Sequence, residues 1–162
     1  MGVWKNEDSR QEMTDYFQIE TIIKAEESYR ADIYLDHKGN LTGGWGSLLN
    51  VGMTLPKQVW EILFRKRFDD AVNGCDFAME LNGVELSDAR CAVIIDMVYC
   101  HGRRGILGYK NMWKAIRKDD FERASAEILD SSWHRDLEIQ RGGRKIETRS
   151  MRAARRMKSG EI

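Results

Sequence analysis

The segment from Asp88 to Cys100 constrains the fold most, because it is apolar around nearly the whole circumference of a helix. Such a helix has no face for water and must be surrounded by other helices. Asp96 is the odd residue inside it. An unpaired buried carboxylate costs several kcal/mol, so we expect Asp96 to be buried and bonded to a backbone or side-chain donor. The segment, capped by Ser87, predicts the centre of a helical bundle.

A long amphipathic helix is predicted before this segment. Pro56, the only proline, suits a first helical turn, and Thr54 is a candidate cap. An apolar stripe then runs from Val59 to Met79, and Asn82-Gly83 ends it. This helix is long enough to join two lobes.

The C-terminal part predicts more helices. Tyr109 to Arg117 and Asp120 to Leu129 are two short ones, and we expect Trp133 to end the bundle. After a break at Gly142-Gly143, residues Lys145 to Lys158 form an Arg-rich helix candidate. Its weak amphipathic pattern favours packing on the bundle over insertion in a membrane.

The N-terminal part combines a helix with a hairpin. Residues 1–13 predict a loose polar arm. Helical spacing begins at Thr14 and places Glu27 at its C-terminal end. Ala31 to Leu35 alternates as a strand, and Leu41 to Trp45 returns as a second one after a His-Lys-Gly-Asn turn.

Three polar residues fall at the ends of these elements: Glu27, Asp36 and Thr42. At those positions their side chains can converge over one cleft. The glycines that follow do not form a phosphate loop, because no helix begins at once and no Lys-Ser/Thr pair is present. Gly43, Gly44 and Gly46 instead predict close approach by another backbone or a ligand, as in a cleft wall.

Acidic and basic residues balance at 26 each, but unevenly along the chain. Residues 1–90 carry a net charge of −6 and residues 91–162 one of +6. Attraction between solvated halves explains this asymmetry at least as well as a polyanion site, although cell-wall polymers and nucleic acid stay open as partners of the basic half.

No metal, cofactor or covalent catalysis is expected. The three cysteines cannot all pair and predict reduced, buried thiols: Cys75, Cys91 and Cys100. The three histidines are scattered without metal-binding spacing: His37, His101 and His134. No elbow motif around a serine or cysteine supports a nucleophile.

The spacing of the polar residues resembles a known family. Glu27, eight residues, Asp36, five residues, Thr42, then Gly44 and Gly46 are similar to the catalytic region of the phage lysozymes, the endolysins of glycoside hydrolase family 24 typified by the T-even phage lysozyme. Further segments follow in the family's order, so that the resemblance covers roughly Ile19 to the C-terminus: Asp96-Met97-Val98-Tyr99 with Gly102, Gly105 to Trp113, Asp120 to Trp133, and Gly143-Arg144.

The resemblance implies an α+β, lysozyme-like fold, in which a long helix joins a small antiparallel β-hairpin or sheet lobe to a larger helical lobe. We expect a single domain over 14–162 after the arm. Its β lobe covers about 28–55, its linking helix about 56–80 and its helical lobe about 81–162.

The implied activity is that of a muramidase, which hydrolyses the β-1,4 bond between N-acetylmuramic acid and N-acetylglucosamine in peptidoglycan. Glu27 is the expected general acid, since the helix dipole and Glu26 both disfavour its ionised form. Asp36, in a polar turn, should stay ionised and, with Thr42, position the attacking water. The family's well-studied member inverts, which predicts carboxyl groups about 6.5–9.5 Å apart.

Three further residues match family positions. Leu48 and Tyr99 match residues that line the saccharide cleft, and Arg144 a basic residue that pairs with the catalytic Glu. Ordinary core or surface roles explain each equally well. Three departures put rate and substrate fit in doubt: Ser28 for a usual Gly, Gly43 for a common apolar residue, and Ser47 for a frequent His in a structural ion pair.

The substitutions at Gly43 and Ser47 favour one alternative, a lysozyme-like domain without turnover that binds the cell wall or a protein, whereas the intact set of three polar site residues argues against it. The expected partner is peptidoglycan, with no nucleic acid, no stable membrane insertion and a monomeric state. We expect a bacteriolytic, antimicrobial product of bacteriophage infection that causes host cell lysis. Without a signal peptide, it would stay in the host cytoplasm until a separate release system lets it reach the wall.

Overall fold

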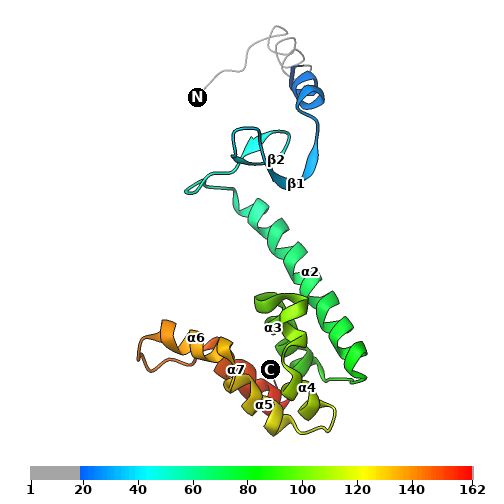
Figure 1. Cartoon of the computed structure of the whole chain (residues 1–162), viewed down its shortest axis with the longest axis vertical. Helices are drawn as coiled ribbons and strands as arrows, with labels where there is room; N and C mark the ends of the chain where they lie inside the picture. Colours follow the sequence, from blue (N-terminus) through cyan, green and yellow to red (C-terminus); the bar gives the residue numbers. More distant parts are fainter. Residues whose placement is uncertain (1–18, 162) are drawn as a thin grey trace, which may run out of the picture. The chain divides into compact units, whose positions relative to one another are not determined.

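The structure, a computed structural model, describes residues 19–161, which fall into two compact units that divide between Leu55 and Pro56. The first contains a small sheet and the second the helices α2 to α7 (Figure 1). This confirms the expected α+β class. The predicted polar arm, residues 1–13, lies outside the described residues.

The described part of the first unit is a helical segment followed by a three-stranded antiparallel sheet. Residues 19–27 are helical. The strands, in the order β1-β2-β3, are β1 (Arg30–Leu35), β2 (Leu41–Gly44) and β3 (Ser47–Leu48). Thr42 pairs with Tyr34 on one side and with Leu48 on the other. The hairpin was predicted, whereas the two-residue β3 is too short for its alternation to be recognised in the sequence.

Helix α2 (Lys57–Asn82) opens the second unit. It begins after Pro56, which occupies the N-cap position without a side-chain hydrogen bond, so the predicted cap at Thr54 is wrong. A proline removes no helical bond here, because the first N–H groups have no intrahelical partner. The helix ends as predicted at Gly83, in the left-handed conformation (φ 63°).

Helix α3 (Asp88–Leu107) carries the centre of the core, with Ile94 and Met97 fully buried. It begins at Asp88 with Ser87 at the N-cap position as predicted, although the Ser87 side chain makes no capping hydrogen bond, and it continues past Cys100 across a kink at the non-helical Gly102 (φ 70°, ψ 171°). It is not surrounded on every side, since Ala92 is exposed.

Asp96 has the predicted donor but is only half-buried. The Arg149 guanidinium pairs with both of its carboxylate oxygens, the Nε bonds measuring 2.9 and 3.1 Å.

Four shorter helices complete the unit: α4 (Lys110–Ile116), α5 (Phe121–Leu129), α6 (Ser132–Arg141) and α7 (Arg149–Ser159). Trp133 does not end the bundle, because Ser131 caps a new helix by accepting a hydrogen bond from the His134 N–H. Helix α7 begins later than predicted, because the Thr148 hydroxyl caps it through the Met151 N–H.

The hydrophobic core cluster lies within the second unit, where its members run from Ala71 to Met157. All three cysteines are free thiols, but only Cys75 is fully buried, and Cys100 is exposed. Burial raises the pKa of the Cys75 thiol to about 12. Among the described helices, none combines the length and the apolar character that crossing a membrane requires.

Candidate active site

The Glu27 side chain lies against the backbone of Gly46. A methyl group built on Gly46 would stand 2.6 Å from Glu27 Oε2 and 3.3 Å from its Cδ, closer than non-bonded atoms approach. Glu27 is the last helical residue, and Ser28 then turns the chain with a left-handed backbone (φ 56°). Glycine adopts this backbone conformation without strain, whereas a residue with a side chain does not.

Asp36 is held by the turn that follows β1. Its Oδ1 accepts the Lys38 and Asn40 N–H groups, each at 2.8 Å, and its Oδ2 accepts the Asn40 amide at 3.0 Å. The main-chain bond from Asn40, followed by the amide bond, lowers the pKa of Asp36 below the ordinary 3.8. The ionised form is therefore favoured, as a water-positioning carboxylate requires.

Thr42 is the one buried residue among described positions 19–55, with 3 % of its surface exposed. Its hydroxyl donates to the Asn40 carbonyl oxygen at 3.1 Å. Asn40 thus links Thr42 and Asp36. Since the hydroxyl proton is already used, the Thr42 oxygen can act towards water only as an acceptor.

The glycines of this region differ in their surroundings. Gly43 has ordinary contacts, with 3.7 Å from a built Cβ to the Asp32 carbonyl oxygen, and Gly44 has nothing within 4 Å. The predicted close approach therefore applies to Gly46, and the approaching group is the side chain of Glu27 itself. Sequence reasoning missed Gly46 and Asn40 as partners of the acids. The Asp-x-x-x-Asn turn pattern was the available signal for Asn40.

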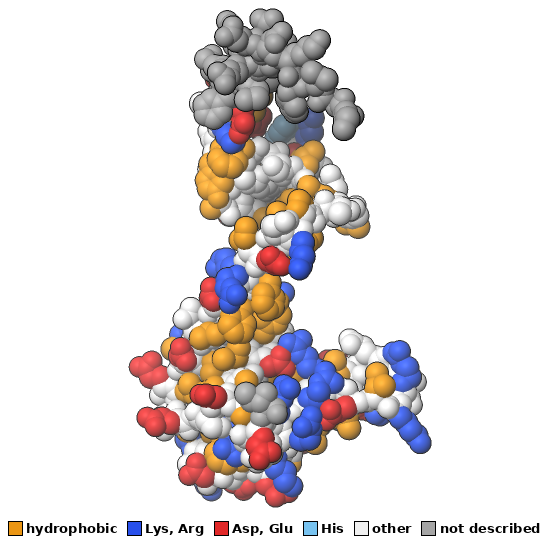
Figure 2. All heavy atoms as spheres, turned by 180° about the vertical axis from the view of Figure 1, so that it is seen from behind, with side chains coloured by type: hydrophobic (Ala, Val, Ile, Leu, Met, Phe, Trp, Pro, Cys, Tyr) orange, Lys and Arg blue, Asp and Glu red, His pale blue; other side chains and the backbone are white. Residues whose placement is uncertain are grey.

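Among the predicted binding residues, Leu48 lies on β3, half exposed and opposite Thr42. Tyr99 belongs to the helical unit, where the Arg67 guanidinium carbon stands 4.4 Å above its ring. Tyr99 lines a pocket of about 580 Å³, which is formed by mainly apolar side chains of α2 and α3 and by arginine side chains of α7. Figure 2 shows hydrophobic side chains gathered beside Lys and Arg side chains on the helical unit.

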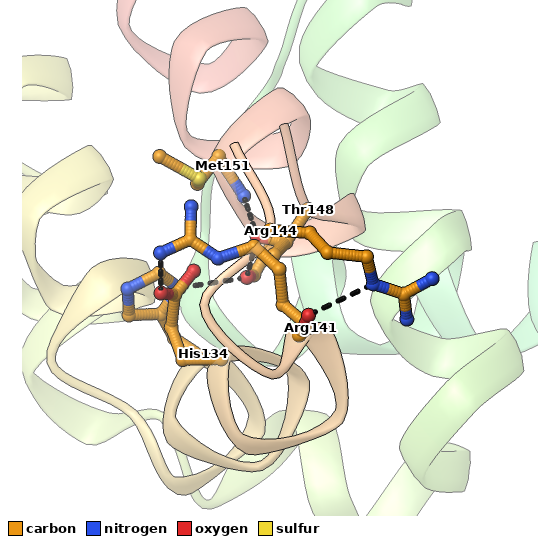
Figure 3. Close-up of polar contacts among 7 residues, drawn as sticks. His134, Arg141, Arg144, Thr148 and Met151 are labelled. Carbon is orange, nitrogen blue, oxygen red and sulfur yellow. Dashed lines mark hydrogen bonds and ion pairs between the residues drawn. The ribbon is translucent and has the colours of Figure 1, made fainter. Parts of the chain in front are cut away.

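Arg144 also belongs to the helical unit, in the loop before α7 (Figure 3). Its side chain donates to the main-chain oxygens of Arg141 at 3.0 Å and Gln140 at 3.4 Å. Those bonds satisfy two main-chain oxygens at the C-terminal end of α6. The pairing of Arg144 with Glu27, implied by the resemblance, stays a prediction.

The helical unit has a second open pocket, of about 680 Å³, lined by both polar and apolar residues. Lys110, Asn111, Glu127 and Ser131 contribute ammonium, amide, carboxylate and hydroxyl groups to it. Groups of this kind bind sugar hydroxyls through directional hydrogen bonds. Across the part of the chain that the structure describes, no group of three or more His, Cys, Asp or Glu side chains is placed to hold a metal ion.

In a comparison with known protein families, the family model described as phage lysozyme matches residues 24–157, which include all six predicted site residues.

Proposed function

Because this chain belongs to the phage lysozyme family, a family of peptidoglycan-degrading glycosidase-type hydrolases, we propose that it is an endolysin that cleaves the bond between N-acetylmuramic acid and N-acetylglucosamine. The observation that carries the proposal is the family match across residues 24–157, combined with a Glu27 carboxyl and an Asp36 carboxylate held in different surroundings. Two carboxyl groups, one to donate a proton to the leaving oxygen and one to act at the opposite face of the sugar, are what glycoside hydrolysis requires.

In the proposed mechanism, Glu27 donates its proton to the leaving glycosidic oxygen as the bond from that oxygen to the anomeric carbon breaks. Water forms the new bond to the anomeric carbon from the opposite face, and its proton passes to Asp36. Three N–H donors already hold the Asp36 carboxylate in place, so little reorganisation accompanies the reaction.

Thr42 serves as the second acceptor for the attacking water. The Thr42 hydroxyl is fixed by its bond to the Asn40 oxygen, and Asp36 is fixed by the same residue. A water that donates one hydrogen to each is oriented with a lone pair towards the sugar. The stereochemical outcome is inversion of the anomeric carbon.

Leu48 and Tyr99 are proposed to contact the saccharide, and Arg144 to support Glu27. The proposed substrate is the peptidoglycan of a bacterial host, and the protein acts as a monomer. We further propose that it accumulates in the host cytoplasm and reaches the wall through a separate release system.

Turbidity of outer-membrane-permeabilised cells tests the activity. Wild type should clear the suspension. The rate of clearing by Glu27→Gln should be lower by about 10³-fold, because a general acid contributes about 10²–10⁴-fold to the rate of the reaction. Glu85→Gln is the control: this exposed glutamate of the helical unit loses the same charge, and clearing should persist. Absence of clearing by wild type would instead select a wall-binding module.

The stereochemistry is tested separately by NMR on the first product formed. Inversion should release the α anomer from the β-linked substrate. Initial release of the β anomer would contradict the role of Asp36 as the water-positioning base.

A further inference from the structure

Gly44 and Gly46 have almost the same backbone conformation and different neighbours. Both are left-handed, with φ of 62° and 69°. A side chain on Gly44 would enter open space, whereas one on Gly46 would overlap the Glu27 carboxyl group. Turn geometry alone therefore accounts for glycine at position 44. At position 46, glycine is needed for a second reason: the Glu27 carboxyl group occupies the space that a side chain would fill.

The turn that carries Gly46 is tied to the chain on both sides of Glu27. Before Glu27, the Lys24 ammonium stands 5.0 Å from the centre of the Trp45 ring. After it, the Tyr29 ring packs against Trp45 with centroids 4.8 Å apart, and Arg30 pairs with Gly44 in the sheet. Three contacts thus hold the turn against the end of the helix.

We propose that Gly46 is a positioning residue for Glu27, its missing side chain providing the space that holds the carboxyl group in the orientation for proton donation. This inference rests on the proposed function of Glu27 as general acid. A glutamate side chain has several rotatable bonds. The Gly46 backbone beside it excludes the rotamers in which the carboxyl group would overlap that backbone. The Trp45 contacts keep that backbone in place.

The test compares Gly46→Ala with Gly44→Ala on a soluble peptidoglycan fragment. Both substitutions force Ala into a left-handed turn, so both should lower the melting temperature similarly. Only Gly46→Ala displaces Glu27. Its kcat should fall by about 100-fold with a smaller change in KM, because a misplacement of about 1 Å at a reacting group costs about that much. The kcat of Gly44→Ala should stay within a few-fold of wild type. Equal losses in the two variants would overturn the proposal.

A double-mutant cycle with Glu27→Asp adds a readout that a purely structural role would not change. The carboxyl group of the shorter Asp side chain does not reach the added methyl group. Glu27→Asp should therefore lower kcat by a much smaller factor in the Gly46→Ala variant than in wild type. In the Gly44→Ala variant, Glu27→Asp should lower kcat by the same factor as in wild type. Additive losses in the Gly46 cycle contradict positioning through Glu27.

Two controls separate this proposal from its premise and from misfolding. If Glu27→Gln keeps wild-type kcat, the proposed function itself fails; if Glu27→Gln is inactive and the Gly46 cycle is additive, the positioning role alone fails. Should Ala unfold the turn, Gly46→Asn and Gly44→Asn provide the same comparison, because Asn tolerates the left-handed conformation. Circular dichroism verifies the fold of every variant.

Discussion

Ser28 holds a left-handed backbone (φ 56°) immediately after Glu27. A residue with a Cβ loses about 1–2 kcal/mol in this conformation, and glycine does not. Part of the gain from Ser28→Gly is offset, because glycine also increases the entropy of the unfolded chain. We expect the local free energy of unfolding to rise by about 0.5–1 kcal/mol, measured by denaturant-dependent hydrogen exchange of the hairpin amides.

Asp119 provides the comparison for Ser28. It has a similar φ of 54°, but Asp tolerates the left-handed region better than most residues. Asp119→Gly should therefore raise the free energy of unfolding by less than Ser28→Gly does. A larger gain at Asp119, or none at Ser28, would mean that backbone strain is not what distinguishes the site.

Asn40→Ala should raise the pKa of Asp36, because it removes the side-chain donor and leaves the main-chain ones. The pKa of Asp36 is lowered in the folded state, so its contribution to stability is present above pH 3.8 and is lost as the pH falls through the folded value. Both this loss and the acid limb of activity should move to higher pH.

Carbon-detected NMR titration of the Asp36 carboxyl measures the shift directly. Asn50→Ala, an exposed asparagine of the same unit, serves as the control and should leave the titration unchanged. An unchanged Asp36 pKa in Asn40→Ala would show that the main-chain donors alone hold the carboxylate.

At the residue scale, the sequence predicted where the three polar site residues lie along the elements, but not their partners. Helical spacing placed Glu27 at a helix end, and the turn cluster placed Asp36. Which side chain approaches Gly46 depends on the angle between the helix and the sheet. That angle is a tertiary property, and no periodicity encodes it.

At the scale of elements, the helices of the second unit were predicted except α6, and the helix ends were predicted only in part. Gly83 ends α2 as expected, since glycine removes the cost of a left-handed cap. Gly102 (φ 70°, ψ 171°) interrupts α3, which consists of two helical segments on either side of a kink. In the second segment Ile106 is fully buried, so tertiary burial holds that segment against the core although glycine breaks the helix before it.

The contact between α2 and α3 depends on Gly74. A Cβ built there would stand 2.7 Å from Val98 Cγ1. Gly74→Ala should therefore lower the free energy of unfolding by about 1–2 kcal/mol, because the overpacking cost exceeds the roughly 1 kcal/mol gained in helix propensity. Chemical denaturation measures the change.

A second substitution tests the cause. Val98→Ala removes the methyl group that Gly74→Ala would overlap, so the double variant should be more stable than the sum of the two single losses predicts. Additive losses would indicate that the helices separate freely at this point. The length of α2 and its apolar stripe were evident in the sequence, but this close approach was not.

At the scale of the whole molecule, buried apolar surface is concentrated in one unit. The core cluster lies between Ala71 and Met157, whereas in described residues 19–55 Thr42 alone is buried. Segments with few buried contacts open locally at a lower free energy than the core. The two units should therefore differ in stability, although one chain connects them.

Native-state hydrogen exchange measures that difference at amides that are hydrogen-bonded in both units. The hairpin amides of Asp36 and Leu49 donate at 2.9 and 2.8 Å, so any weaker protection there reflects opening rather than a missing bond. They should exchange at least about 100-fold faster than the amide of Met97, which corresponds to an opening free energy about 3 kcal/mol smaller. Equal protection would show that the hairpin opens only when the helical core unfolds, in which case the sheet that carries Asp36 draws its stability from that core.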